Sequence, residues 1–219
     1  MSDRTITVTD ELRQYVLAHS TPVDSVARDL IEETHAALPE KAVMQVSPDQ
    51  AAFLTLMTKI VGARQAVEVG TFTGYSALAI ARGLGDGGRL LCCDLSEEWT
   101  SVARRYWKRS GVADRIELRI APAVETLRDL PREPYLDLAF IDADKVGYVS
   151  YWDELVPRMR PGGVILVDNV LWSGRVTETD SGDATVQAIR AFNEHAAADT
   201  RMETVILPIA DGITLSRRR

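Results

Sequence analysis

Oxygen-bearing side chains that can bind a metal ion follow two apolar runs in the second half of the chain. Asp142 ends the run that starts at Tyr135, and Asp168 and Asn169 follow the run that starts at Gly163. If the two runs are neighbouring parallel strands, these three donors meet at one edge of the sheet. Two carboxylates and an amide, with no His or Cys nearby, favour Mg²⁺, with Mn²⁺ or Ca²⁺ as alternatives, over a structural zinc site. The same residues also suit solvated loops or helix caps, and the spacing alone leaves both interpretations open.

Lys145 follows Asp142 by three residues and is close enough to act on a hydroxyl group bound at the same place. A neighbouring cation disfavours the protonated ammonium, and a lysine that has lost its proton is a usable general base. The alternative is an ordinary solvated lysine at the start of a helix. Lys145 is therefore a candidate catalytic base.

A second candidate site lies in the turn between an apolar run, residues 66–69, and a helical pattern, residues 75–80. Gly70 and Gly74 let the backbone approach a ligand closely, and the helix that follows presents free N–H groups. Glu68 would repel a dinucleotide pyrophosphate, whose GxGxxG pattern is missing, and would suit a positively charged ligand such as S-adenosylmethionine. An ordinary turn with a solvated Glu is the alternative.

Asp94 ends the next apolar run and can accept hydrogen bonds from ribose hydroxyls. It supports an adenosine ligand without distinguishing S-adenosylmethionine from NAD. It would also suit the start of the following helix, whose dipole an acidic side chain complements.

The pattern of the elements predicts one α/β domain, with a helical cover over residues 1–62 and an α/β core over residues 63–219. From Ala66 strands and helices alternate, which favours a Rossmann-like, doubly wound, seven-stranded sheet that is mostly parallel with an antiparallel C-terminal strand. The expected strands are residues 66–69, 89–95, 116–120, 135–142, 163–168, 202–208 and 213–216. The expected core helices are 75–80, one from Ser96 to Gly111, 124–130, 147–159 and 184–198.

The helical cover contains apolar stripes at helical spacing near Leu12 and between Val23 and Ile31. A further helix starts after Ser47, which together with Gln50 predicts a capping box, and it stops at Gly62. We expect these helices to pack against an edge of the sheet.

The composition limits the classes of partner. The 219 residues are 46% hydrophobic and carry a formal net charge of −7, which disfavours general attraction to nucleic acid, although Arg217 to Arg219 form a basic cluster expected to be a frayed tail. No apolar run approaches the roughly 20 residues of a membrane span, and the amino terminus has no apolar signal segment. We therefore expect a cytoplasmic protein with no membrane or nucleic-acid partner.

Five stretches, taken together, resemble the caffeoyl-CoA and catechol O-methyltransferases, the cation-dependent enzymes that use S-adenosylmethionine, and most closely their smaller bacterial members. They are MQVSPDQ at 44–50, EVGTFTGYSAL at 68–78, CDLS at 93–96, IDADK at 141–145 and DNVLWSGRV at 168–176. The resemblance covers nearly the whole chain in order. The pair IDADK and DNVLW is much more specific than a glycine turn.

The resemblance implies roles for individual residues. Asp142, Asp168 and Asn169 would bind the divalent cation, and Lys145 would be the catalytic base, with Asp142 also contacting the substrate. The implied cofactor contacts are Val46, Glu68, Gly70, Thr71, Ser76, Asp94, Ala123 and Asp144. Asn169 and Ser173 are carried as further substrate contacts, and Trp172 would flank an aromatic ring or anchor its loop on the core. The stretch around Ala123 begins with Ala121, where the family more often has Gly.

The implied reaction is methyl transfer from S-adenosylmethionine to one hydroxyl of a small aromatic diol held on Mg²⁺, in a protein that forms a homodimer. Two other classes stay open from the sequence. A nicotinamide oxidoreductase fits the order of the elements and Asp94, and a nucleic-acid-binding module fits the basic C-terminal cluster.

Overall fold

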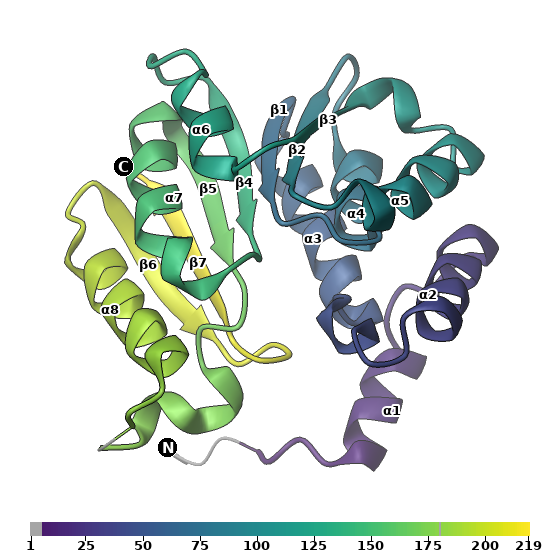
Figure 1. The fold of residues 1–219 in the computed structure, drawn as a ribbon, viewed down its shortest axis with the longest axis horizontal. Helices are drawn as coiled ribbons and strands as arrows, with labels where there is room; N and C mark the ends of the chain where they lie inside the picture. The colour runs from purple at the N-terminus through teal and green to yellow at the C-terminus, as the bar shows by residue number, and fades with distance from the viewer. Residues whose placement is uncertain (1–5, 180) are drawn as a thin grey trace.

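The protein folds into a seven-stranded sheet covered by helices on both faces (Figure 1). The structure is a computed structural model, and it describes residues 6–179 and 181–219. The strands are β1 (Gln65–Val69), β2 (Arg89–Asp94), β3 (Ile116–Ile120), β4 (Leu136–Ile141), β5 (Met159–Val167), β6 (Met202–Leu207) and β7 (Ile213–Arg218). Their order in the sheet is β3-β2-β1-β4-β5-β7-β6.

The first five strands are parallel, and β7 is antiparallel to both of its neighbours, β5 and β6. The predicted mostly parallel, doubly wound sheet with an antiparallel C-terminal part is therefore confirmed. The strand order reverses between β1 and β4. In open sheets of this kind the ligand binds outside the carboxyl ends of the strands at such a reversal.

Two groups of helices cover the two faces of the sheet (Figure 1). One group is α3 (Pro48–Val61), α4 (Tyr75–Gly83) and α5 (Glu97–Arg109), with α2 (Ser25–Ala37) packed against α4 and α5. The other is α6 (Ala123–Arg128), α7 (Tyr148–Leu155) and α8 (Ala184–Ala198). The first helix, α1 (Asp10–Ala18), leaves each of its nine residues at least partly exposed. Short 3-10 turns complete the fold: η1 (Ala42–Met44), η2 (Ala113–Arg115), η3 (Lys145–Gly147), η4 (Val156–Arg158) and η5 (Trp172–Thr177).

The central strand β4 explains why both faces need a helical layer. Leu138 and Phe140 belong to the apolar core under α3, α4 and α5, whereas Ala139 and Ile141 belong to the core under α7 and α8. Successive side chains of a strand point to opposite faces, so a strand segment buried on both sides is apolar on both, as residues 138–141 are. Asp142 follows these residues at the carboxyl edge of the sheet. The other charged residue of the strand, Asp137, lies near its beginning and accepts from the amides of Arg64 and Gln65.

Most elements lie within about three residues of the predicted bounds, and three predictions are corrected by the structure. Strand β5 begins at Met159, so the helix predicted to reach that residue ends earlier, at Leu155. The predicted capping box is wrong, because the Ser47 side chain makes no capping hydrogen bond. The predicted frayed tail is also wrong: β7 reaches Arg218, and Arg217 and Arg219 both form ion pairs with Glu203.

No helix among the described residues combines the length and the apolar character that crossing a bilayer requires.

Candidate active site

A cavity of about 1450 Å³ opens at the carboxyl ends of the parallel strands. Its wall includes the turns after β1, β2, β4 and β5, the start of α3, part of α1 and the turn between β6 and β7. All but one of the predicted site residues line this cavity: Val46, Gly70, Thr71, Ser76, Asp94, Ala123, Asp142, Asp144, Lys145, Asp168, Asn169, Trp172 and Ser173. The exception is Glu68, which is fully buried behind the wall.

The backbone brings the ends of β1, β4 and β5 into one row. The amide of Asp142 donates to the carbonyl of Val69 at 2.8 Å, and the amide of Asp168 donates to the carbonyl of Ile141 at 3.0 Å. Gly70 has a φ of +89°, and a Cβ atom there would lie 1.9 Å from the carbonyl oxygen of Asp142. Only glycine permits this approach, so the turn after β1 and the two aspartates are fixed together.

Lys145 lies at the centre of the predicted catalytic group. Its Nζ atom donates to Asp142 Oδ1 at 3.1 Å, to Asn169 Oδ1 at 2.7 Å and to the phenolic oxygen of Tyr148 at 2.6 Å. Tyr148 is fully buried and donates its own hydroxyl proton to the carbonyl of Asp168 at 2.9 Å. Burial, followed by the charge of Asp142, raises the pKa of Tyr148 well above its usual value, so this proton stays in place. Tyr148 therefore accepts from Lys145 and fixes the position of its nitrogen.

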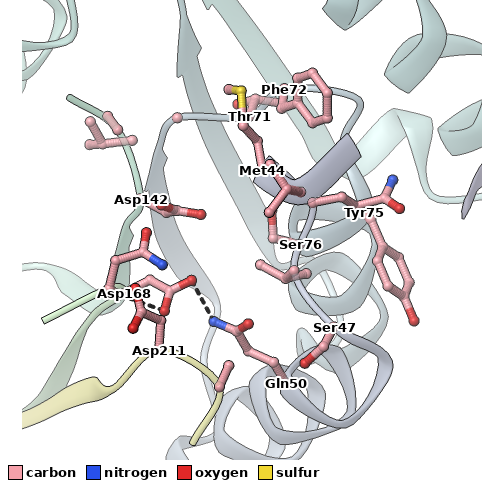
Figure 2. A pocket seen from close by; sticks show the side chains of 18 of the residues that line it. Met44, Ser47, Gln50, Thr71, Phe72, Tyr75, Ser76, Asp142, Asp168 and Asp211 are labelled. Atoms are coloured by element: carbon pink, nitrogen blue, oxygen red, sulfur yellow. Dashed lines mark hydrogen bonds between the residues drawn. The ribbon is translucent and has the colours of Figure 1, made fainter. Parts of the chain in front are cut away.

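Asp168 is the most buried charged member of this group, with 3% of its surface exposed. Its Oδ2 atom accepts from Gln50 Nε2 at 2.7 Å, and its Oδ1 atom accepts from the amide of Asn169 at 2.7 Å. Burial, and then the negative charge of Asp142, raise the pKa of Asp168 well above its ordinary value. Figure 2 shows both aspartates directed into the same part of the cavity. The pair is therefore a place where an added positive charge is favourable.

The loop after β5 is held in an uncommon backbone conformation. Asn169, Trp172 and Ser173 have φ values of 56°, 46° and 52°, in the left-handed region that non-glycine residues seldom adopt. The turn between β6 and β7 holds this loop, because the Ser173 amide donates to the Asp211 carboxylate and the Leu171 amide donates to the Asp211 carbonyl. Asn tolerates this region better than most residues, and here it turns the amide oxygen of position 169 toward Lys145.

Two predicted cofactor residues already hold backbone in place. Asp94 Oδ2 accepts from the amides of Thr71 and Phe72 at 2.9 and 2.8 Å, so it fixes the glycine turn after β1. Asp144 accepts from the hydroxyl of Tyr151 and from the amide of Gly147. A carboxylate offers about four acceptor positions, so both residues retain capacity for a ligand. Their contacts with a cofactor stay a prediction.

Comparison with known proteins identifies the family. Residues 18–219 match the family model described as O-methyltransferase. The chain belongs to the O-methyltransferase family. "Probable caffeoyl-CoA O-methyltransferase 2" of Dictyostelium discoideum is 38% identical over 210 residues, which are 94% of this chain and 90% of the relative. The resemblance in the sequence is thereby confirmed, and the alternative of a nicotinamide oxidoreductase is set aside.

Two solved structures have the same fold as this O-methyltransferase. The O-methyltransferase from Bacillus cereus, solved in complex with SAH, is 35% identical with a TM-score of 0.87, and the match covers 95% of this chain and 97% of that one. The O-methyltransferase TomG from Streptomyces achromogenes, which is involved in tomaymycin synthesis and was solved in complex with SAM, is 29% identical with a TM-score of 0.86, covering 95% and 96% of the two chains.

Sequence reasoning missed four residues of the O-methyltransferase site. The sequence gives Gln50 a role only in a capping box and assigns no role to Asp211, whereas both line the cavity. Tyr148 follows Lys145 by three residues, a spacing at which helical side chains meet, and this was the available signal. Arg13 lines the cavity from α1, a helix expected only to cover the sheet.

Glu68 differs most from its expected state in this O-methyltransferase. Burial raises the pKa of Glu68 to about 8, and nearby Ser76, Cys92 and Thr71 oppose that shift only in part. The carboxyl group is therefore neutral near pH 7 in the protein as described, rather than the charged group that the sequence suggested. Its contact with a cofactor stays a prediction.

We expect a Glu68→Gln variant to remove a pH dependence of stability. The folded protein binds the Glu68 proton more tightly than the unfolded chain, so this residue lowers the free energy of unfolding as the pH rises from about 4.5 to about 8. Between about pH 5 and about pH 9, the wild type should lose at least about 1 kcal/mol relative to the variant, the worth of roughly one pKa unit. Urea unfolding at both pH values measures this, and parallel curves for the two proteins would show that Glu68 is not perturbed.

Proposed function

We propose that this O-methyltransferase transfers a methyl group from S-adenosylmethionine to one hydroxyl of a catechol-type acceptor, with a divalent cation and with Lys145 as the general base. The observation that carries the proposal is the position of Lys145. Its Nζ atom contacts Asp142 and Asn169, which come from the ends of two adjacent strands, inside the cavity that the predicted cofactor residues also line.

The proposed cofactor fits the part of the cavity next to β1 and β2. Gly70 and Thr71 lie on the wall at the start of the turn that leads into α4, and Asp94 holds that turn from the neighbouring strand. Trp99 and Phe72 form an edge-to-face aromatic pair on the same wall, with ring centroids 5.3 Å apart. Apolar rings beside a carboxylate suit an adenosine group, and SAM or SAH occupies two related structures.

The donor set fits a hard divalent cation. Among residues 6–179 and 181–219, no group of three or more His, Cys, Asp and Glu side chains is placed to hold a metal ion. The proposed ligands are two carboxylates, Asp142 and Asp168, and the amide oxygen of Asn169, which is the oxygen chemistry that Mg²⁺ prefers. Burial, and then the charge of Asp142, raise the pKa of Asp168, and a bound cation would favour its ionised form, which is consistent with the assignment. When bound, Mg²⁺ would supply Lewis-acid chemistry that favours loss of a hydroxyl proton from the acceptor.

The protein's own residues would place and deprotonate the acceptor. Lys145 lines the cavity beside Asp142 and Asn169, and its nitrogen would take the hydroxyl proton. The Lys145 nitrogen lies 5.9 Å from the centroid of the Trp172 ring, so an acceptor that reaches the base also contacts Trp172. Val16, Ile209 and Trp172 add apolar surface to the wall of the cavity, which suits an aromatic ring.

The acceptor chemistry can be tested with matched diols. We expect purified enzyme with S-adenosylmethionine and Mg²⁺ to methylate catechol, and to methylate resorcinol at least about 100-fold more slowly, because only adjacent hydroxyls can bind one cation together. Formation of the methyl ether, followed by mass spectrometry, is the measurement. Equal rates on the two diols would contradict a vicinal acceptor. If neither diol is methylated, catechol itself is not the acceptor, and larger hydroxylated compounds are tested next.

Two further expectations stay predictions. A homodimer is compatible with the exposed apolar side chains of α1, among them Tyr15 and Val16, which are 61% and 41% exposed. The cytoplasmic location also stays a prediction.

A further inference from the structure

We propose that Gln50 is a positioning residue that fixes the Asp168 carboxylate for cation binding while leaving its negative charge intact. The inference rests on the proposed cation dependence. It concerns a residue to which the sequence assigned only a role in starting α3.

Gln50 reaches Asp168 from the opposite wall of the cavity. It is the third residue of α3, it is 2% exposed, and its Nε2 atom donates to Asp168 Oδ2 at 2.7 Å across 118 positions of sequence. Figure 2 shows this bond joining the start of α3 to the end of β5. A buried amide held in this way restricts the carboxylate to one orientation.

The local sequence offers Gln50 a different partner, which it does not take. In a capping box the side chain three residues after the cap returns to the cap residue, here Ser47. Instead, Ser47 makes no capping bond, and its buried Oγ atom has no hydrogen-bond partner among the described residues. The side chain of Gln50 thus binds Asp168 in the active site and does not cap the start of α3. This choice of partner indicates that Gln50 serves to hold Asp168.

The chemistry of the two donors to Asp168 supports a role in cation binding. Both donors, the Gln50 amide and the backbone amide of Asn169, are neutral, and each occupies one oxygen. A Lys or Arg at position 50 would satisfy the same oxygen but would cancel the charge that attracts a cation. A neutral donor orients the carboxylate, preserves its charge and leaves a lone pair on each oxygen.

Asp142 differs from Asp168 in this respect. Its Oδ1 atom accepts from the charged Lys145, whereas the side-chain donor to Asp168 is the uncharged Gln50. The two carboxylates are therefore held differently, and Asp168 is the one with which no cationic side chain among the described residues forms an ion pair. Partners that orient metal ligands in this way typically contribute about 10- to 100-fold to metal affinity.

Two substitutions of Gln50 test the orientation of the Asp168 carboxylate separately from the charge near it. Gln50→Met keeps the length and removes the donor, and Gln50→Lys keeps a donor and adds a positive charge. The probe is Mn²⁺ alone, titrated into each protein with free Mn²⁺ followed by electron paramagnetic resonance. We expect Gln50→Met to bind Mn²⁺ at least about 10-fold more weakly than the wild type, and Gln50→Lys at least about 100-fold more weakly.

The control is Gln187→Met, the same replacement on the exposed face of α8, which should bind Mn²⁺ as the wild type does. Thermal unfolding without metal and calorimetric binding of S-adenosylhomocysteine check that each variant is folded. For Gln50→Met, methyl transfer should return at high Mn²⁺ concentration, a rescue that a general structural defect would not show.

The possible results test the role of Gln50 separately from the proposed function. If the wild type and Gln50→Met bind Mn²⁺ with the same affinity, Gln50 does not position the site, and the proposed function stands. If Gln50→Lys binds as tightly as the wild type, the argument from charge is overturned. If the wild type itself binds no Mn²⁺, the cation dependence fails, and the inference fails with it.

Discussion

Lys145→Met should lower the turnover number by at least about 100-fold, within the range of about 10² to 10⁴ that general-base catalysis contributes. Methionine keeps the length of the side chain and loses the nitrogen that joins Asp142, Asn169 and Tyr148. The acceptor hydroxyl then has no protein base to receive its proton. Single-turnover formation of S-adenosylhomocysteine, measured with enzyme in excess over S-adenosylmethionine, isolates this step from product release.

The same variant should bind Mn²⁺ at least as tightly as the wild type. In the metal-free protein the Lys145 ammonium contacts Asp142 and Asn169, two of the three proposed ligands, so it competes with a cation for their oxygens. Lys59→Met, on an exposed position of α3, is the matched control and should leave both turnover and metal affinity unchanged. A loss of metal affinity in Lys145→Met that accounts for its lost activity would contradict the role as a base.

The sequence was sufficient for the fold because its apolar runs and turn residues are local signals. Residues 184–198 were predicted and observed as one helix, and α3 ends at Gly62, whose φ of +64° only glycine adopts readily. The doubly wound, mostly parallel sheet followed from the alternation of strands and helices along the chain. The prediction failed at Met159, because β5 is extended there by pairing with Leu136 of β4, a distant contact that local pattern does not contain.

The candidate site likewise contains residues that local signals predict and residues that depend on distant contacts. The positions of Asp142, Asp168 and Asn169 were predictable because they are the first or second residues after a strand, and parallel strands bring their ends together. Gln50 and Asp211 were not predictable, because each acts on a segment far away in sequence and has a plausible local role where it stands. The state of Glu68 was also beyond the sequence, since its pKa depends on complete burial behind the cavity wall.

Asp168→Asn should reduce methyl transfer at least about 100-fold while making the metal-free protein more stable. The first effect follows from the loss of one of two charged ligands in the proposed cation site. The second follows because the Asp168 charge is buried beside that of Asp142, an arrangement that disfavours its ionised form in the folded protein. An Asn at this position keeps the size of the side chain, and Gln50 can turn its amide to accept from it.

A gain of about 1 kcal/mol would raise the unfolding midpoint by roughly 2 to 4 °C in a protein of this size. Differential scanning fluorimetry near pH 8, with EDTA present, measures the gain, and Asp86→Asn, at an exposed turn, is the control that should change neither property.

Adding Mg²⁺ should raise the midpoint of the wild type and leave that of Asp168→Asn unchanged, because only the wild type binds the cation. Wild-type enzyme in EDTA should lose methyl transfer as the variant does, and full activity in EDTA would remove the cation from the mechanism. Opposite effects of one substitution on activity and on metal-free stability are expected where a binding site holds like charges together before its ligand arrives.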